Sequence, residues 1–347
     1  MDSQKYQRRF PEVVCLGELL IDLVPEPSGA TLQVAQSLRI APGGAPANVA
    51  VALKRLGVQT GFIGKVGDDP FGRFLRSVLS REGIDLRSFK LTPKSLTRLA
   101  CVTNDSNEQQ RFIFYGNPGA DVLLAPRDIQ MSYLKHARAL HFGSISLIQE
   151  PARSATIKAL DIARANGLMI SFDPNLRPAL WPNLEKARKE ILSSIKRCQI
   201  LKLSESEWEF LFPYGKITEC YAIPQLQHLR LLAVTLGKSG AIIATPQGQV
   251  RTAGIQVQVA DTTGAGDGFM AGVLYWLVSK HLEKQEDSSG LRKIVQFANM
   301  VGALTCARAG AIPAFPVLDE VLFQLARVKK SGKIKISTSR DIGNTRR

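Results

Sequence analysis

The sequence has few of the features that mark secreted, membrane-spanning or metal-cluster proteins. Its five cysteines are widely spaced and include no Cys-x-x-Cys pair, which argues against a disulfide framework or a zinc site. Its four histidines lack the spacing of metal ligands. No apolar run reaches about 18 residues, so no transmembrane helix is expected. The polar start, Met1 to Pro11, has no secretory signal. These absences predict a cytoplasmic globular protein.

Acidic residues are also scarce. The chain has 45 Lys and Arg against 30 Asp and Glu, a formal net charge of +15. Eight basic residues and one acidic residue fall in 327–347, so this segment carries eight minus one, or +7. It has little to bury and is predicted to be a disordered tail. Two interpretations stay open: a solubilising tail, or one that binds nucleic acid incidentally.

Strand-like runs alternate with helical patterns from Val13 to Ala309. This alternation predicts an α/β fold, a doubly wound and mostly parallel sheet flanked by helices. Ligands bind such sheets at the carboxyl ends of the strands. Two stretches, 20–40 and 96–124, hold short β-type runs without helices. We expect these to pair as a small accessory sheet.

A glycine-rich turn, Asp261-Thr262-Thr263-Gly264-Ala265-Gly266-Asp267, separates a β-type run, Ile255 to Val259, from a helical run that starts at Gly268. Amides at a helix N-terminus lack intrahelical partners and attract negative charge. A carboxylate there would repel phosphate, unless it takes a proton from the attacking hydroxyl. The turn therefore predicts Asp267 as a base and Gly264 to Gly266 as an anion hole. The alternative is a tight turn with an N-cap aspartate.

A second glycine turn, Gly43-Gly44-Ala45-Pro46-Ala47-Asn48, opens the first long helix. Paired glycines allow a ligand to approach the backbone, and Asn48 offers a donor and an acceptor to a polyol. Asp22 lies in the apolar run from Leu16 to Val24, where a carboxylate can accept two sugar hydroxyls. Helix capping and an ordinary turn aspartate are the alternatives.

A third turn, Thr235-Leu236-Gly237-Lys238-Ser239-Gly240, contains Gly-Lys-Ser but is not a P-loop, because Leu232 stands where the first glycine belongs. It can still bind the phosphates or ribose of a nucleotide. Lys202, Ser204 and Glu207 lie at or just beyond a strand end. Glu207 is a candidate to hold Mg²⁺ through water, or else a helix-start acid.

Together these motifs resemble the ribokinase-like, or PfkB, carbohydrate kinases over about Val13 to Pro316, and among them fructokinases most. The two glycine turns, at Gly43 and Gly264, are the family signatures. The likeness to fructokinases also rests on the segments Gly17 to Pro25, Phe114 to Asp121, Phe142 to Ser146, Asp173 to Arg177 with Leu180 to Pro182, and Gly310 to Ala314.

The resemblance implies a kinase domain over 1–326 that phosphorylates a sugar with ATP, most simply D-fructose to D-fructose 6-phosphate. A β lid from about 18–42 and 96–121 would cover the sugar and form a homodimer. The implied sugar site is Asp22, Gly43, Gly44, Asn48, Phe114 and Arg177. The implied nucleotide site is Lys202, Ser204, Thr235, Gly237, Gly240 and Asn299. Glu207 would serve Mg²⁺, and Asp261, Thr263 and Gly310 would surround K⁺.

The chain departs from the family pattern at two places. Gly116 stands where similar fructokinases and 2-keto-3-deoxygluconate kinases often have arginine, and Ser204-Glu205-Ser206-Glu207 replaces the common Asn-x-x-Glu. A kinase for 2-keto-3-deoxygluconate or another sugar therefore stays open, with Arg177 to meet a carboxylate. A non-catalytic protein that works through nucleic acid is the alternative of another class, and the intact Asp267 turn argues against it.

Overall fold

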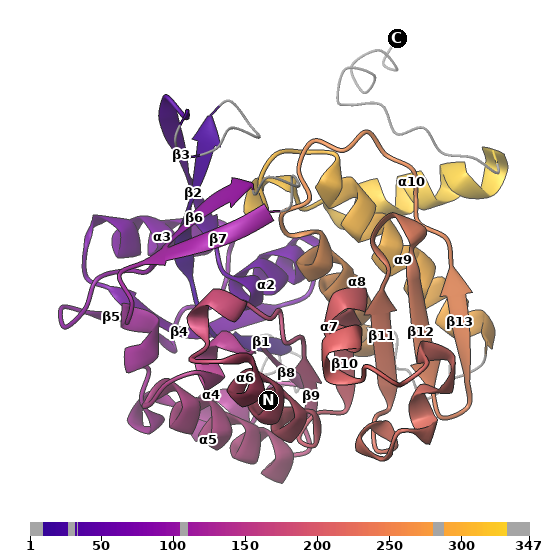
Figure 1. Cartoon of the computed structure of the whole chain (residues 1–347), viewed down its shortest axis with the longest axis horizontal. Coiled ribbons are helices and arrows are strands. Elements are labelled where there is room, and N and C mark those ends of the chain that lie inside the picture. The colour runs from indigo at the N-terminus through magenta and orange to yellow at the C-terminus, as the bar shows by residue number, and fades with distance from the viewer. Residues whose placement is uncertain (1–9, 27–31, 33, 105–109, 280–287, 332–347) are drawn as a thin grey trace, which may run out of the picture. The chain divides into compact units, whose positions relative to one another are not determined.

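The structure is a computed structural model, and it describes residues 10–26, 32, 34–104, 110–279 and 288–331 (Figure 1). The chain divides into two compact units. The first unit comprises Met1–Val51 and Gln59–Leu201, and the second comprises Ala52–Val58 and Lys202–Arg347. Within the described ranges, no helix is both long enough and apolar enough to cross a membrane.

The main sheet has the predicted α/β pattern. Its strands are β1 Val13–Leu16, β4 Thr60–Gly67, β5 Phe89–Thr92, β8 Ala139–Phe142, β9 Met169–Phe172, β10 Ile200–Ser204, β11 Leu231–Thr235, β12 Ala241–Thr245 and β13 Gly248–Thr252. They form a 9-stranded sheet in the order β13-β12-β11-β10-β9-β8-β1-β4-β5. The pairs β4–β5, β1–β4, β1–β8, β8–β9 and β9–β10 are parallel, whereas β11–β12 and β12–β13 are antiparallel.

Central strands of this sheet are buried along their whole length, as β1, β4 and β8 show. A strand covered on both faces needs a continuous apolar run instead of alternation, and β1 supplies one with Val-Val-Cys-Leu. Leu16 pairs with Ile63 on one side and with Phe142 on the other. Gly17 and Glu18 therefore leave the sheet at its carboxyl edge, where ligand sites of α/β folds lie.

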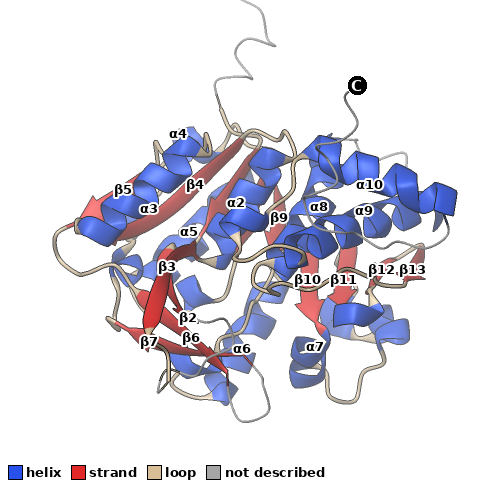
Figure 2. Cartoon of the chain, turned by 90° about the horizontal axis from the view of Figure 1, so that it is seen from above, coloured by secondary structure: helices blue, strands red, loops and turns tan. Residues whose placement is uncertain are grey.

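Helices alternate with these strands (Figure 2). They are α2 Ala45–Arg55, α3 Pro70–Arg81, α4 Met131–Leu134, α5 Ala152–Ala165, α6 Leu184–Ile195, α7 Glu205–Leu211, α8 Ala265–Ser279, α9 Ser288–Cys306 and α10 Leu318–Ser331. In the second unit, α9 packs against α8, α10, β12 and β13. This packing buries both sides of α9 and fixes α8, the helix that begins at the Gly264 turn.

The two stretches expected to form an accessory sheet do so. The strands β2 Leu20–Glu26, β3 Ser37–Gly43, β6 Leu99–Asn104 and β7 Gln110–Tyr115 form a 4-stranded sheet in the order β3-β2-β6-β7. Residues 27–31, 33 and 105–109 of the predicted lid lie outside the described residues. Asp22 pairs with Ala100, and Ala100 pairs with Phe114. Since paired residues share a face of a sheet, Asp22 and Phe114 lie on the same face.

Three expectations about element boundaries need correction. Ile255 to Val259 does not form a strand, because its apolar side chains line a cavity. The helix expected from Gly268 already begins at Ala265, and its expected end at 280–282 lies outside the described residues. Residues 327–331, expected to be a disordered tail, are the last turn of α10, since the apolar spacing of that helix continues to Val328. Residues 332–347 lie outside the described residues.

Candidate active site

Asp267 lies in the first turn of α8 and is 7% exposed. The chain enters this helix through Gly264, whose φ of +80° is in the left-handed region. A Cβ at Gly264 would lie 2.8 Å from the Cβ of Ala311. Only glycine combines that backbone conformation with so little space. The turn therefore places a buried carboxylate at the start of a helix, as the sequence predicts.

The amides of this turn are not equivalent. Ala265 donates its N–H to the carbonyl oxygen of Thr262 at 3.2 Å, whereas the Gly264 carbonyl accepts the N–H of Gly268 at 2.8 Å. The first amides of a helix have no intrahelical acceptor. Of the three predicted anion-hole amides, those of Gly264 and Gly266 are consequently better placed than that of Ala265 to meet an anion.

Lys202 of β10 reaches the same turn. Its side chain is buried, with the residue 6% exposed, and its Nζ lies 3.0 Å from the position that a Cβ on Gly266 would take. The positive end of the α8 dipole and a buried ammonium group therefore lie close together. Two positive centres in one place favour a negatively charged group there. The turn is thus suited to a phosphate.

The structure brings together all three residues that the resemblance assigned to a monovalent cation. Asp261 Oδ1 accepts the N–H of Thr263 at 2.9 Å and its hydroxyl at 2.7 Å, and Oδ2 accepts the N–H of Gly310 at 2.9 Å. Burial, together with the charge of Asp261, raises the pKa of the neighbouring Cys306 thiol. Asp261 therefore fixes two turns, and carbonyl oxygens of such turns are suitable ligands for K⁺.

A cavity of about 430 Å³ in the second unit collects four predicted nucleotide residues. Thr235, Gly237, Gly240 and Asn299 all line it, as do Ala265 and Gly266 of the α8 turn. The volume is in the range of small-molecule sites. Sequence reasoning missed the apolar part of the wall, which includes Ile255, Val257, Val259, Phe269 and Ala303. The alternation in 255–259 was a signal for it, although this segment was interpreted as a strand.

Ser204 and Glu207 have a structural role in the described part of the chain. Ser204 is the N-cap of α7, and Glu207 Oε2 accepts both the N–H and the hydroxyl of Ser204, at 2.8 and 2.9 Å. This is a capping box, which agrees with the alternative of a helix-start acid. Neither residue lines the 430 Å³ cavity. Among the described residues, no three or more His, Cys, Asp or Glu side chains gather as a metal site.

The predicted sugar residues of the first unit also come together. Asp22 and Asn48 are buried, at 7% and 4% exposed. A Cβ on Gly43 would overlap the carboxylate of Asp22, and a Cβ on Gly44 would lie 2.5 Å from the carbonyl oxygen of Glu18. Asn48 donates its N–H to the Gly44 carbonyl at 2.9 Å. The glycines therefore let the loop lie directly on Asp22.

Arg177 and Phe114 are joined by a residue that sequence reasoning missed. The Arg177 guanidinium lies over the ring of Phe112, 4.6 Å from its centroid, and Phe112 stacks on Phe114 at 6.2 Å. Phe112 is two residues from Phe114 on β7, so both rings lie on the face that carries Asp22. The period-2 spacing of the two rings was the available signal.

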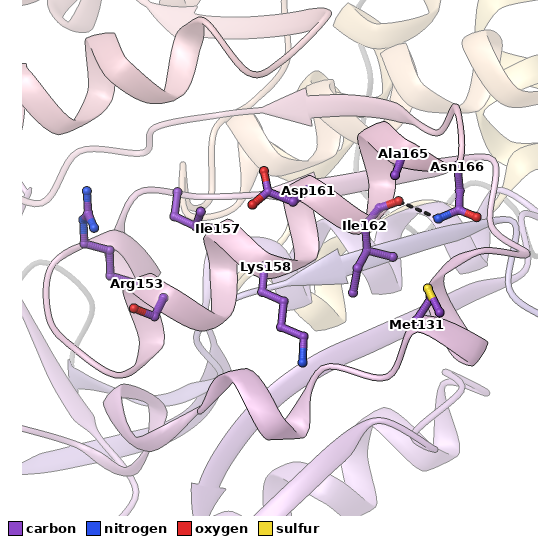
Figure 3. Close-up of a pocket in the computed structure, with 9 residues that line it drawn as sticks. Met131, Arg153, Ile157, Lys158, Asp161, Ile162, Ala165 and Asn166 are labelled. Atoms are coloured by element: carbon purple, nitrogen blue, oxygen red, sulfur yellow. Dashed lines mark hydrogen bonds between the residues drawn. The ribbon is translucent and has the colours of Figure 1, made fainter.

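A different hollow of about 410 Å³ lies on the surface of α5, beside α4 (Figure 3). Its charged side chains already have protein partners. Lys158 donates to the Pro126 carbonyl at 2.7 Å, Asp161 pairs with Arg197 at 2.9 Å, and Arg153 pairs with Glu190 at 3.1 Å. None of the predicted site residues lines this hollow. Nothing in its chemistry calls for a ligand.

Comparison with known proteins agrees with this geometry. The family model described as "pfkB family carbohydrate kinase" matches residues 11–318. The protein named probable fructokinase-3 from Arabidopsis thaliana is 43% identical over 322 residues, which cover 92% of each chain. The crystal structure of fructokinase with bound ATP from Xylella fastidiosa has a TM-score of 0.83 and 31% identity, and the match covers 93% of this chain and 100% of that one.

A second similar structure is a fructokinase double mutant from Vibrio cholerae O395 in a form with bound fructose, ADP and potassium ion. It has a TM-score of 0.79 and 35% identity, over 90% of this chain and 97% of that chain. The family match spans most of the chain. The protein belongs to the pfkB family of carbohydrate kinases.

Proposed function

We propose that this carbohydrate kinase is a fructokinase, which transfers the γ-phosphoryl group of ATP to the primary hydroxyl of D-fructose and yields D-fructose 6-phosphate and ADP. The names of its relatives and the ligands of similar structures support this substrate pair. One observation carries the chemistry. Asp267 is buried in the first turn of α8, and the Gly266 turn beside it lines a cavity of nucleotide size.

The reaction needs one proton transfer and one phosphoryl transfer. The Asp267 carboxylate takes the proton from the primary hydroxyl of the sugar, and the hydroxyl oxygen forms a bond to the γ-phosphorus. The bond from that phosphorus to the bridging oxygen breaks, and ADP leaves. The amides of Gly264 and Gly266, with some help from Ala265, stabilise the charge on the transferred group. Lys202 adds a buried positive charge beside them.

The sugar is proposed to bind to the first unit. Asp22 accepts two of its hydroxyl groups, Asn48 donates and accepts, and the Gly43–Gly44 backbone lies against the ring. The Phe112–Phe114 pair supplies an apolar surface, and Arg177 donates to the remaining oxygens. Each of these side chains is held by the protein itself, so little ordering entropy is lost when the sugar binds.

The nucleotide is proposed to occupy the 430 Å³ cavity. Thr235, Gly237 and Gly240 would meet its ribose and phosphates. Asn299 would support the cavity wall, because its Nδ2 donates to the hydroxyl of Thr252 at 2.9 Å and to the Ala253 carbonyl at 3.3 Å. The base would contact the apolar wall at 255–259. Ser204 would act indirectly, by capping α7.

Two cations are part of the proposal. Mg²⁺, bound with ATP, neutralises phosphate charge, and Glu207 would hold it through water while capping α7. K⁺ would be held near Asp261, Thr263 and Gly310, where it orders the backbone that carries the anion hole. The direct bonds of Asp261 to both turns fit this role.

Arg177 favours a second candidate, a kinase for an acid sugar such as 2-keto-3-deoxygluconate. Its guanidinium is positioned by Phe112, and a planar guanidinium binds a carboxylate through two hydrogen bonds. Gly116 argues against the acid sugar, because a carboxylate needs a cation and glycine supplies none. The two candidates share Asp267 and differ only at the sugar.

A kinase assay over a panel of sugars tests the proposal. We expect kcat/KM for D-fructose to exceed that for 2-keto-3-deoxygluconate, ribose and glucose by at least about tenfold, since a missing or extra polar contact is strongly discriminated. A higher kcat/KM for 2-keto-3-deoxygluconate than for D-fructose would show that the acid sugar is the substrate. Phosphorylation of none of these sugars would remove the proposed substrate class.

The protein is also proposed to form a homodimer through its accessory sheet. The row Ile40, Leu23, Cys101 and Ile113 runs across all four strands on the face opposite Asp22. Leu38, Ile40, Ile113 and Tyr115 are each at least 42% exposed, and such a surface is typical of an interface. Ile40→Glu should give a monomer in light scattering. Phe323→Glu on α10, which is 60% exposed, is the matched control and should leave the dimer intact.

A cytoplasmic location completes the proposal. All five cysteines are free thiols, and four of them are buried. Free buried thiols are typical of a reducing compartment. A fluorescent fusion of the full chain would test this, and accumulation in an organelle would contradict it.

A further inference from the structure

Glu18 holds the start of α2. It lies between β1 and β2 and is only 3% exposed. Its Oε1 accepts the N–H of Ala45, the first residue of α2, at 3.0 Å. Its carbonyl oxygen lies 2.5 Å from the position that a Cβ on Gly44 would take. Glu18 therefore contacts the Gly43–Gly44 loop with both its side chain and its main chain.

The second carboxyl oxygen of Glu18 is unusual. Oε2 is buried and has no hydrogen-bond partner among the described residues. Next to Glu18 is a cavity of about 10 Å³, which Asp121, Ser146 and Gln149 also line, and which is close to the smallest that can hold one water molecule. Burial of a half-satisfied carboxyl group costs stability. A helix can be capped without this cost, as exposed Asn183 does for α6 by accepting the Lys186 N–H at 2.8 Å.

We propose that Glu18 is a positioning residue for sugar binding, because its carboxyl group holds the first amide of α2 and so keeps the Gly43–Gly44 loop against Asp22. This inference rests on the proposed role of that loop in binding the sugar. Glu18 does not itself need to touch the sugar. It acts through the backbone, by fixing the Ala45 amide next to the two glycines.

The protonation state of Glu18 changes the strength of this hold. The pKa of Glu18 is raised to about 7, mainly by burial and also by the charge of Asp121, against the opposing effects of the Glu18 and Ala45 amides and the charge of Arg177. Asp121 is itself paired with buried Arg98 at 3.0 Å. A charged acceptor makes a stronger hydrogen bond than a neutral one, and a negative charge is favoured at a helix N-terminus. The loop is consequently held more firmly above neutral pH than below it.

The Glu18→Gln variant tests this dependence. Glutamine keeps the acceptor oxygen and the size of the side chain, but it stays neutral at every pH of the experiment. We expect the ratio of sugar KM, variant over wild type, to be near one at about pH 6 and to rise about three- to tenfold at about pH 8.5. The ratio for ATP KM should stay constant over the same range. A sugar ratio that does not change with pH would overturn the inference, since a purely structural residue gives that result.

Glu18→Ala removes the acceptor altogether. The sugar KM should then rise at least about tenfold at every pH, while the KM for ATP stays within about twofold. Asn183→Ala is the matched control, because it removes a helix cap from α6 and should leave the sugar KM unchanged. Parallel rises of both KM values in Glu18→Ala would contradict a positioning role. If this variant does not fold, Glu18→Gln decides alone.

Asp22→Ala separates failure of this inference from failure of the proposed function. If Asp22→Ala leaves the sugar KM unchanged, the Gly43–Gly44 loop is not the sugar site, and that part of the proposed function is wrong. If it raises the sugar KM and neither Glu18 variant does, only the role of Glu18 is overturned.

Discussion

Two glycine turns open helices in this protein, and they differ in what surrounds their glycines. Beside Gly43 and Gly44, the space is filled by the protein's own oxygen atoms, from the Asp22 carboxylate and the Glu18 main chain. Beside Gly266, the nearest group is the Nζ of Lys202, at 3.0 Å from the position of a Cβ, and the turn lines the 430 Å³ cavity.

The difference indicates two uses of the same motif. The Gly43 turn lies on carboxylate and carbonyl oxygens, so its glycines allow close packing within the first unit. The Gly264–Gly266 turn lies beside a cation and a cavity, so its glycines keep amides available for an anion. Under the proposed function, the first turn would bind the sugar. The second turn would bind the transferred phosphoryl group.

The largest expected effect is that of Asp267→Asn. It removes the proton acceptor next to the Gly264–Gly266 turn and keeps the side-chain shape, so turnover should fall by roughly 10² to 10⁴. The KM values and the melting temperature should change little. Asp319→Asn, in the first turn of α10, is the matched control and should keep full turnover. If Asp267→Asn keeps more than about a tenth of wild-type turnover, Asp267 is not the base.

Alanine at one glycine of each turn tests the comparison directly. Gly43→Ala places a methyl group on the Asp22 carboxylate, and overpacking of this kind costs about 1–3 kcal/mol of unfolding free energy. A Cβ at Gly266 would meet only the end of the Lys202 side chain, and the position lies within α8, where alanine is the better helix former. Gly266→Ala should keep or slightly raise the melting temperature, yet lower turnover by about tenfold, because Lys202 must move.

Urea unfolding and steady-state kinetics on both glycine variants separate the two outcomes. If Gly43→Ala and Gly266→Ala lower the unfolding free energy equally, the proposed difference between the surroundings of the two turns is wrong.

The features that the sequence predicted and the structure shows are those encoded locally. A glycine turn between a strand and a helix is encoded within a few residues, so both turns and Asp267 could be found without a structure. The central strands were also predictable, because burial on both faces leaves continuous apolar runs such as Val13–Leu16.

The contacts that were missed depend on pairing between distant segments. Phe112 meets Arg177 only because of the register of β7 and the path after β9, and Glu18 meets Ala45 only because β1 and α2 are adjacent in space. The segment 255–259 shows a further limit. Apolar alternation is the same for a strand in a sheet and for an extended chain that lines a cavity.

Asp22→Ala tests the Gly43–Gly44 turn through sugar binding. Two sugar hydroxyls would lose a charged acceptor, which costs about 1.5–3 kcal/mol for each hydrogen bond. The KM for the sugar should rise and the KM for ATP should not. Titrations of each substrate at saturation of the other measure this. Equal losses for both substrates would show that Asp22 supports the fold instead of the sugar.

Stability should also depend on pH at the Gly43–Gly44 turn, through Glu18. The pKa of Glu18 is about 7 in the folded protein, against the usual 4.5, because burial disfavours its charged form. Between these values the folded state therefore binds more protons than the unfolded state, and the contribution of Glu18 to the unfolding free energy falls as pH rises. Glu18→Gln has no such proton to lose.

The unfolding free energy of Glu18→Gln, relative to wild type, should consequently increase from about pH 5 to about pH 8 in urea titrations. Groups common to both proteins cancel in this difference, so the trend reports Glu18 alone. Parallel curves would mean that the buried oxygen finds a partner, such as a water molecule in the adjoining cavity, that restores an ordinary pKa. If this difference in unfolding free energy and the sugar KM ratio, variant over wild type, both rise with pH, the charged Glu18 carboxylate lowers the stability of the fold while it strengthens the hydrogen bond that positions the Gly43–Gly44 loop.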